Sequence, residues 1–545
     1  MKMLIQRLQL SRAKHPSLAG HVRLSKRVAR WIASYQLTDE QALACDGASN
    51  ELVAHRRAAL QRLSKDWQDS APLTIAATHD AQRAVPDMRL TAALRVPFMF
   101  SDWMAQRFPP IAFWQGAEDF SLRDLDGNRY IDLTGSYGVN LFGADFYKRT
   151  MEQAQAIAAP MGATLGGYQH ELLEVITRLQ GITGHQQFSF HMSGTEAVMQ
   201  AVRLARHHTK RRRIVRFAGA YHGWWDDVQP GVGNPMPPGE VLTLRDMHAR
   251  TLEVLRTRTD IACVLVNPIQ VLHPNQNPPT DSTLLLKRQV VGTPDVAGYA
   301  QWLKQLRQIC SERGIALIFD EVFLGFRLAA GGAQAYFDVQ ADLVCYGKTL
   351  GGGYPLGLVA GEPKWMERLS GGSPSNLVFA RGTFNAHPHV VAGILAFLRA
   401  LEQPDISACY ETLDQTWRAR AESLNRALQG IGAPVGVRAL STVWTLTFDV
   451  PSRFHWLYSY YLKRHGVAVP WTGASRIIWP ANTPDAVFKT ACDRMVAAAE
   501  QMMEDGWWPT ADQRPTNTRA ASMRRLLRRE LLRAKWPSVF RWLDR

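Results

Sequence analysis

Short apolar runs alternate with helical patterns through the middle of the chain. The runs are HQQFSFHMSG, RRIVRFAGAY, IACVLVNPI, GIALIFDEV and ADLVCYGKT, and the helical stretches between them include TEAVMQAVRLARHH and AGYAQWLKQLRQICSERG. Such alternation is typical of parallel strands joined by crossover helices. We therefore expect an α/β fold with a large, mostly parallel sheet, which binds its ligands outside the carboxyl ends of the strands.

The pattern changes on both sides of this region. The first 95 or so residues are rich in Arg, Ala and Leu, and ASNELVAHRRAALQRLSKDW has helical spacing. Further on, DFSLRDLDGNRYIDL alternates on both sides of Asp126-Gly127-Asn128, which is a hairpin signal. After residue 396, long helical stretches accompany a few strand-like runs. We predict a helical extension over 1–95, a small α+β domain formed by 96–150 and 396–512, a large domain over 151–395, and a tail over 513–545.

The net charge of +15 is concentrated at the two ends of the chain. Residues 1–30 and 514–545 are strongly basic, whereas the residues between them are close to neutral, as in an ordinary enzyme. In the tail, RAASMRRLLRRELLRAKW places apolar residues at helical spacing among arginines. Such a helix packs on the body, docks on an acidic protein such as an acyl carrier protein, or lies on an anionic membrane; nucleic acid is the least favoured partner.

Composition also bounds the compartment. No stretch of about 18 apolar residues is free of charge, and Arg7 and Arg12 interrupt the short apolar run at the N-terminus. The six cysteines show no CxxC spacing, which argues against a disulfide framework and a cysteine-built zinc site. We expect a cytoplasmic enzyme with reduced cysteines.

Candidate chemistry stands where the predicted strands end. GIALIFDEV terminates in Asp320 and Glu321, which alone could be a solvated acidic turn. Lys348 follows another apolar run and precedes three glycines, so it is either part of a flexible loop or a shielded amine with a lowered pKa. The chain between Asp320 and Lys348 is long enough for one helix and one strand. We therefore expect both side chains at the same edge of the sheet.

A third candidate opens a predicted helix. Ser193 and Glu196 fit a capping box, whose function is structural. The same helix N-terminus, with Gly194 and Thr195, also presents free N–H groups that could hold a phosphate. The residues alone leave both interpretations open.

These segments in this order resemble the class III (ω-type) aminotransferase family, which includes glutamate-1-semialdehyde aminomutase. The similarity is carried by MSGTEAVMQAVRLAR, GAYHG, DEVFLGFRLA, DLVCYGKTLGGGYPLG and RGTFNAHP. It continues more weakly from about residue 110 to 505 and does not include the first 95 residues or the basic tail. The resemblance implies a pyridoxal 5′-phosphate (PLP) enzyme of fold type I with a homodimeric active site.

The resemblance also implies a role for each matching position. Lys348 would bind the cofactor as a Schiff base and move the substrate proton. Asp320 would pair with the pyridine nitrogen. Val322 and Tyr221 would pack on opposite faces of the ring, with His222 beside Tyr221.

The remaining positions concern the phosphate and the second subunit. Ser193, Gly194 and Thr195 would hold the phosphate, and Thr383 would reach it from the neighbouring subunit. For Glu321, a hydrogen bond near the cofactor's 3′-oxygen and a structural ion pair remain open. His387 and His389 are not expected to bind a metal, and no other metal site is expected.

The sequence departs from the family pattern at positions that bind the substrate in the family. RFPPIAF replaces an entrance segment that commonly reads NSPVR, and Ala474 stands where the aminomutase has a gating glutamate. Asn267-Pro268 replaces the usual Glu-Pro. Arg476 could replace the missing carboxylate binder, although we favour a solvated loop residue. Trp114, Trp471 and Trp479 are candidates for the substrate entrance.

We therefore expect a ping-pong aminotransferase whose acceptor is an aldehyde, a ketone or a carrier-bound carbonyl. A role in secondary metabolism is a hypothesis by analogy with family members of this kind. Two alternatives are open. One is intramolecular amino transfer, as in the aminomutase, or racemisation. The other is a non-catalytic binding protein that keeps the fold, against which the retention of both Lys348 and Asp320 argues.

Overall fold

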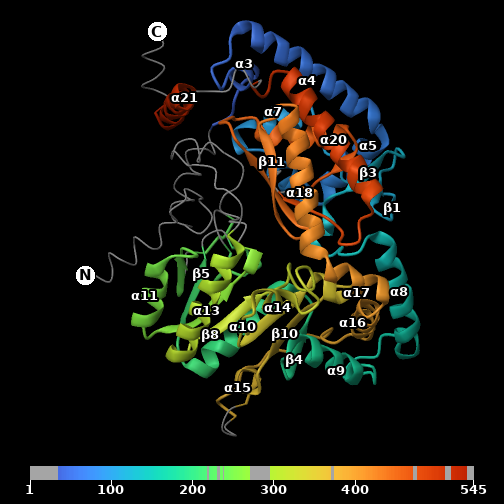
Figure 1. The fold of residues 1–545 in the computed structure, drawn as a ribbon, viewed down its shortest axis with the longest axis vertical. Helices are drawn as coiled ribbons and strands as arrows, with labels where there is room; N and C mark the ends of the chain where they lie inside the picture. The colour runs from blue at the N-terminus through green and yellow to red at the C-terminus, as the bar shows by residue number, and fades with distance from the viewer. Residues whose placement is uncertain are drawn as a thin grey trace.

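The computed structural model describes the greater part of the chain. The described residues are 35–217, 220–229, 233–236, 239–269, 295–369, 374–470, 476–509 and 517–536. Figure 1 shows two halves: a lower one built around a large sheet, and an upper one in which helices from both ends of the chain lie together. Trp471 and Ala474 lie outside the described residues.

A seven-stranded sheet forms the centre of the lower half, in the order β4-β10-β9-β8-β7-β5-β6. Its strands are β4 (Gln187–His191), β5 (Arg213–Phe217), β6 (Val241–Leu244), β7 (Ile261–Val266), β8 (Ala316–Asp320), β9 (Leu343–Gly347) and β10 (Gly357–Gly361). The five apolar runs of the sequence form β4, β5, β7, β8 and β9, which confirms the predicted α/β class. Every residue of β7, β8 and β9 is buried, because helices cover both faces of the sheet.

Two strands of this sheet were not predicted from the sequence. β6 pairs with β5 in parallel at one edge, and β10 runs antiparallel between β4 and β9. The glycines at both ends of β10 weaken its strand pattern. The sheet is therefore mostly parallel, and the carboxyl ends of β4, β5, β7, β8 and β9 meet at one edge.

The lower half also contains the helices that surround this sheet (Figure 1). They are α8 (Ala144–Ala158), α9 (Leu172–Thr183), α10 (Gly194–Thr209), α11 (Ala249–Thr257), α13 (Val296–Arg313), α14 (Gly332–Phe337), α15 (Pro363–Met366), α16 (Pro388–Leu401) and α17 (Pro404–Glu411), with short turns η3 (Ala159–Met161) and η5 (Lys348–Gly351). Asp295 caps the start of α13 by accepting a hydrogen bond from the N–H of Gly298, and Gly314 ends it in the left-handed conformation. These caps fix where the crossover helix enters and leaves the sheet.

The upper half combines segments that are distant in sequence. The predicted hairpin is confirmed: β2 (Ser121–Arg123) and β3 (Arg129–Asp132) are antiparallel, and Gly127 lies at φ +86° in the turn. β3 also pairs in parallel with β13 (Val467–Ala468). The other elements here are β1 (Gly116–Glu118), η2 (Gly135–Gly138), α18 (Leu413–Gly430), β11 (Val435–Leu440), β12 (Val443–Phe448), η6 (His455–Leu457), α19 (Tyr458–Arg464), β14 (Arg476–Ile478) and α20 (Asp485–Glu504).

The described part of the N-terminal extension, residues 35–95, packs on this upper half (Figure 1). It contains α3 (Asp39–Leu43), α4 (Asn50–Ser70), α5 (Pro72–Ala84) and α6 (Pro86–Ala93), and it is followed by η1 (Phe98–Phe100) and α7 (Ser101–Ala105). Arg56 on α4 is 1% exposed, forms a two-pronged ion pair with Asp46, and donates to the carbonyl of Gly506 at 2.8 Å. Because an unpaired buried guanidinium would be costly, these contacts attach the extension firmly to the body.

The basic tail contains α21 (Asn517–Lys535). Its apolar side chains Met523 and Leu527 are buried, and Glu530 forms an ion pair with Arg453 at 2.9 Å. The helix therefore packs on the body through its apolar side, which was one of the interpretations of the sequence. Its arginines 525, 528 and 529 remain exposed.

The cysteines are free and none of the described helices could span a membrane. Four of the six cysteines are buried and two are partly buried. Within the described ranges, no helix combines the length and the apolarity that a bilayer crossing requires.

The buried imidazole of His455 gives a testable pH dependence of stability. It stacks on Phe448, donates from Nε2 to the carbonyl of Val450 at 2.9 Å, and accepts at Nδ1 from the indole N–H of Trp508 at 3.1 Å. Burial lowers the pKa of His455 to about 3. The unfolded chain therefore binds a proton below about pH 6.5 that the folded protein does not bind.

Stability should consequently fall as the pH drops below 6.5, and His455 should account for about 2 kcal/mol of the loss at pH 5. Thermal unfolding of the wild type and of His455→Gln between pH 7.5 and 5 measures this. The variant should be less stable at pH 7.5, and its stability should depend less on pH. An exposed control, His79→Gln, should follow the wild-type profile; equal slopes in all three proteins would contradict the assignment.

Candidate functional site

Asp320 is fixed by hydrogen bonds at the carboxyl end of β8. Its Oδ2 lies 2.8 Å from Nδ1 of His222, and its Oδ1 accepts from the backbone N–H of Val322 at 3.2 Å. Both side chains are almost fully buried. Within the described residues Nε2 of His222 has no hydrogen-bond partner, although it is buried. A buried polar atom of this kind calls for a functional explanation.

Lys348 follows β9, the neighbouring strand, and begins η5. Its φ of +35° is uncommon for a residue with a side chain, and such strain is often found at functional sites. Burial and the charge of Arg327 lower the pKa of the Lys348 amine, while Asp320 opposes the shift. The lysine is therefore a shielded amine next to a carboxylate, and not part of a flexible loop. Loss of its proton, which a nucleophilic amine requires, is made easier.

The N-terminus of α10 is capped by side chains, and two of its backbone N–H groups have no acceptor within the helix. Ser193 accepts from the N–H of Glu196 at 3.2 Å, and the Glu196 carboxylate accepts from the N–H of Met192 at 2.9 Å. The N–H groups of Gly194 and Thr195 have no acceptor within the helix. Capping and anion binding, which the sequence offered as alternatives, are therefore compatible here.

Two glycines show how closely these segments meet. A Cβ at Gly194 would lie 2.5 Å from Cγ1 of Val322, and a Cβ at Gly223 would lie 2.4 Å from Oγ1 of Thr195. Neither position could hold a larger side chain without a shift in its neighbours. The starts of α10 and of the segment after β8 thus lie against each other, and the loop after β5 lies against Thr195.

Tyr221 stands on that loop with its ring 59% exposed. The side-chain amide of Asn267, at the end of β7, donates to the Tyr221 carbonyl at 3.4 Å. Asn267, which the sequence marked only as a departure from the family pattern, therefore helps to hold the loop. Thr383 is exposed, and within the described part of the chain it has no hydrogen bond to the other site residues.

Glu321 has neither of the two roles that the sequence left open, a hydrogen bond near the cofactor's 3′-oxygen or a structural ion pair. Its two carboxylate oxygens accept from the backbone N–H groups of Ala333 at 2.6 Å and Gln334 at 3.2 Å, at the start of α14. Burial raises the pKa of Glu321 to about 7. The Glu321 carboxyl group therefore caps the start of α14, whereas the carboxyl group of the adjacent Asp320 contacts His222.

Arg476 is the site residue that the sequence misjudged. It is the first residue of β14, pairs with Thr445 of β12, and is not a solvated loop residue. Its Cζ lies 5.6 Å from the centre of the Phe323 ring, and Nζ of Lys348 lies 5.7 Å from the same centre. Loss of surrounding water lowers the pKa of Arg476 to about 10. No carboxylate lies within ion-pair distance of Arg476 among the described residues.

The tryptophans separate into pocket and core. Trp114 is 40% exposed and lines a cavity that is described below. Trp479, in contrast, is completely buried against Trp417, Trp444 and Phe488. The prediction that Trp479 lies at a substrate entrance was therefore wrong, because its ring belongs to the aromatic core of the upper half.

This set of groups matches the chemistry of PLP. A shielded amine suits the cofactor's aldehyde, a buried carboxylate suits a protonated ring nitrogen, and a helix N-terminus with free N–H groups suits a phosphate. Nε2 of His222 has no hydrogen-bond partner among the described residues and is therefore available to a bound group. Gly194 has no side chain, so a bound group can approach its backbone closely at the same edge. The residues that are present therefore fit the cofactor.

Comparison with known proteins agrees with this chemistry. The family model of the class III aminotransferases matches residues 104–227 and 294–498. The glutamate-1-semialdehyde 2,1-aminomutase of Alkaliphilus oremlandii is 34% identical over 344 residues, which cover 59% of this chain and 74% of that protein. The enzyme of the same name from a Hydrogenobaculum species is 32% identical over 357 residues, covering 62% and 77%.

Solved structures share the fold. A glutamate-1-semialdehyde aminomutase from Pseudomonas aeruginosa superposes with a TM-score of 0.67 at 18% identity and covers 83% of this chain and 99% of its own. A β-phenylalanine aminotransferase from Variovorax paradoxus gives a TM-score of 0.65 at 24% identity, covering 82% and 97%. Together with the family match, these findings show that the chain belongs to the class III aminotransferase family and is a PLP-dependent enzyme.

Proposed function

We propose that this enzyme transfers an amino group from an amino donor to an aldehyde, a ketone or a carrier-bound carbonyl compound in two successive half-reactions. The observation that supports this most directly is that the Lys348 amine lies close to the Asp320 carboxylate, and that it contacts the same Phe323 ring as the Arg476 guanidinium. When bound, PLP supplies an electron sink and a temporary carrier for the amino group. We expect the reaction to take place in the cytoplasm.

The chain's own residues divide the work. Lys348 would hold the cofactor through Nζ and would move the proton of the substrate carbon. Asp320 would keep a proton on the ring nitrogen through its charge. His222 keeps the Asp320 carboxylate oriented through their 2.8 Å contact.

The segments around the site would position the cofactor. Val322 and Tyr221 pack against its ring, and Ser193, Gly194 and Thr195 bind its phosphate at the start of α10. Thr383 contributes from a second copy of the chain, so the active enzyme is a homodimer. Exposed rings near Thr383 support a covered face there: Phe379 and Phe384 are 70% and 53% exposed in the single chain.

We expect one of the two substrates to be a carboxylic acid, because Arg476 can bind its carboxylate. A guanidinium beside the reactive lysine binds a carboxylate with two parallel hydrogen bonds. Because Phe323 separates the two cations, a substrate carboxylate at Arg476 would leave its amino-bearing carbon near Lys348. An amino acid as donor therefore fits this site better than a simple amine.

Intramolecular amino transfer is the second candidate, because the curated relatives are named as aminomutases. Against it stands RFPPIAF, in which the arginine of the entrance segment is absent. An aminomutase needs only one amino compound and isomerises it, whereas an aminotransferase stops after one half-reaction until a carbonyl acceptor is added.

A half-reaction screen distinguishes the two. The purified holoenzyme is mixed with single amino compounds, and the absorbance of the lysine-bound cofactor is followed. We expect acidic amino donors to bleach this absorbance once per active site, with turnover only after an aldehyde or ketone is added. Arg476→Met should reduce the preference for acidic over neutral donors by at least about tenfold. Continuous turnover of one amino compound alone would contradict the proposal.

A further inference from the structure

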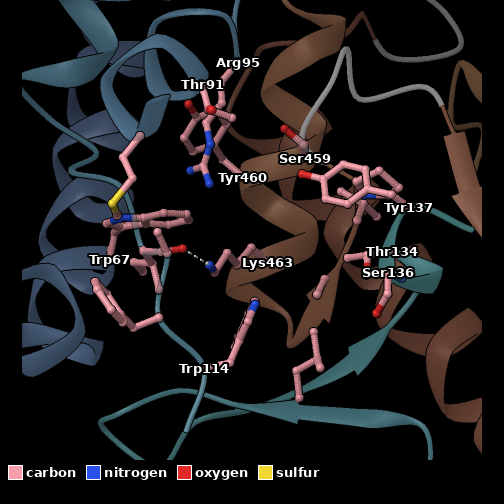
Figure 2. A pocket seen from close by; sticks show the side chains of 18 of the residues that line it. Trp67, Thr91, Arg95, Trp114, Thr134, Ser136, Tyr137, Ser459, Tyr460 and Lys463 are labelled. Carbon is pink, nitrogen blue, oxygen red and sulfur yellow. Dashed lines mark hydrogen bonds between the residues drawn. The ribbon is translucent and has the colours of Figure 1, made fainter. Parts of the chain in front are cut away.

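A cavity of about 620 Å³ lies between the N-terminal extension and the body (Figure 2). Trp67 of α4 and Thr91 of α6 line one side, and Lys463 of α19 lines another. The part of its wall that α4 and α6 supply precedes residue 104, where the match to the family begins. The cavity is thus built partly from residues outside the segments that the family model matches. Its size is that of a small-molecule site.

Lys463 reaches into the middle of this cavity, as Figure 2 shows. Its Nζ lies 5.5 Å from the ring centre of Trp67 and 5.2 Å from those of Trp114 and Tyr130. Nζ also donates to the carbonyl of Ile111 at 3.3 Å. An ammonium group has three donors, and this bond uses one of them. Among the described residues no carboxylate lies within ion-pair distance of Lys463, so the group retains donors for a ligand.

A second cation lines the same cavity. Arg95 follows α6, and its charge lowers the pKa of Lys463 beyond the effect of burial. Burial also lowers the pKa of Arg95 to about 10. Two like charges in one partly buried cavity repel each other, and an anion placed between them would stabilise both.

Two acidic groups lie near these cations among the described residues. Asp124 raises the pKa of Lys463, but its carboxylate already accepts from the Tyr130 hydroxyl at 3.0 Å and from the Asn128 amide at 2.9 Å. Asp87, exposed at the start of α6, also lines the cavity. Among the described residues, two cations and one exposed carboxylate therefore line it, together with aromatic rings.

The cavity adjoins the catalytic edge through η2. Ser136 and Tyr137 line the cavity and have φ values of +46° and +57°, which cost about 1 to 2 kcal/mol per residue with a side chain. The next residue, Gly138, faces the site: a Cβ there would lie 3.3 Å from Cδ of Lys348. Three consecutive residues thus connect the cavity to the reactive lysine.

We propose that this cavity is a second anion subsite, in which Lys463 and Arg95 bind an anionic group of the substrate several bonds away from the reacting carbon. The inference rests on the proposed aminotransferase function and extends it to the class of substrate. Arg476 binds the carboxylate close to the reacting carbon, and the cavity binds a second carboxylate or a phosphate beyond an apolar spacer. The N-terminal extension is then part of the substrate site.

Binding tests the subsite without turnover. Calorimetry of the holoenzyme with glutarate and, separately, with ethyl phosphate shows which anion the cavity accepts. For the preferred anion, Lys463→Met should weaken binding about 20-fold or more, whereas Lys463→Arg should retain most of it. The matched control is Lys364→Met, since Lys364 also lies over a tryptophan ring, at 5.3 Å, but is exposed outside the cavity. Equal binding by Lys463→Met and the wild type, or no binding of either anion, would overturn the subsite.

Kinetics then connect the subsite to the reaction. The preference for amino donors with a distal anionic group over uncharged counterparts should fall about 20-fold or more in Lys463→Met and stay at the wild-type value in Lys364→Met. An unchanged preference in Lys463→Met would overturn the inference. If the wild type binds the anion but transaminates no donor, the proposed function fails while the anion subsite stands.

Discussion

Replacement of Lys348 by Ala should lower turnover by about 10⁴-fold or more while leaving the fold intact. The variant loses both the amine that binds the cofactor and the group that moves the substrate proton, and a positioned acid or base alone contributes about 10²- to 10⁴-fold. Steady-state rates with an acidic donor and an aldehyde acceptor measure the loss. Borohydride reduction followed by peptide mass analysis should label the Lys348 peptide in the wild type and no peptide in the variant.

The control for this variant is another lysine. Lys489 is exposed on α20 and pairs with Asp493, so Lys489→Ala should keep both turnover and the labelled peptide. Thermal unfolding should show that Lys348→Ala is folded; relief of its φ of +35° is not expected from this change, because alanine also has a Cβ. Transamination by Lys348→Ala at the wild-type rate would refute the assignment of the reactive lysine.

Replacement of Asp320 by Asn should slow turnover by about 10²- to 10⁴-fold, which corresponds to about 3 to 5 kcal/mol of barrier. The amide keeps the size of the side chain and an acceptor for the N–H of Val322. It cannot supply the negative charge that keeps a proton on the ring nitrogen. Cofactor content, measured by absorbance after gel filtration, should stay close to that of the wild type while the rate falls.

The neighbouring carboxylate provides a matched control. Glu321 is equally buried, but its oxygens bind the N–H groups at the start of α14. Glu321→Gln should therefore reduce stability by about 1 kcal/mol and affect turnover much less than Asp320→Asn does. If both variants lost turnover equally, the division of roles between the two adjacent residues would be wrong.

The central strands were predictable because burial on both faces produces continuous apolar runs. β7 and β8 are fully buried and rich in Ile, Val and Leu, so their sequences alone identify them. β6 and β10 escaped prediction, since a four-residue edge strand and a strand bounded by glycines show neither a long apolar run nor clear alternation. The insertion of β10 as an antiparallel strand depends on tertiary contacts, which the local sequence pattern does not encode.

The cofactor site was predictable to the extent that it is made of strand ends. Asp320 and Lys348 each follow a buried strand, and parallel strands bring their carboxyl ends to one edge. Arg476 was misjudged because its strand is three residues long and lies in the small sheet, where nothing in the neighbouring sequence indicates burial. Asn267 was recognised only as a departure, since its bond to Tyr221 joins two loops.

The sequence by itself determined the α/β class through its apolar runs and the cofactor through its resemblance to the family. It also predicts Lys348 as the reactive lysine, because short motifs encode which residues follow which strand. Only the tertiary structure decided what surrounds that lysine. Arg476 contacts the same Phe323 ring as Lys348, the Glu321 carboxylate binds the start of α14, and Lys463 lines one cavity with Arg95 of the extension. The physical reason is that these contacts join residues that are not neighbours in the sequence. Glu321 and Ala333 are 12 positions apart, the other pairs are farther apart, and no local pattern records which of them fold against each other.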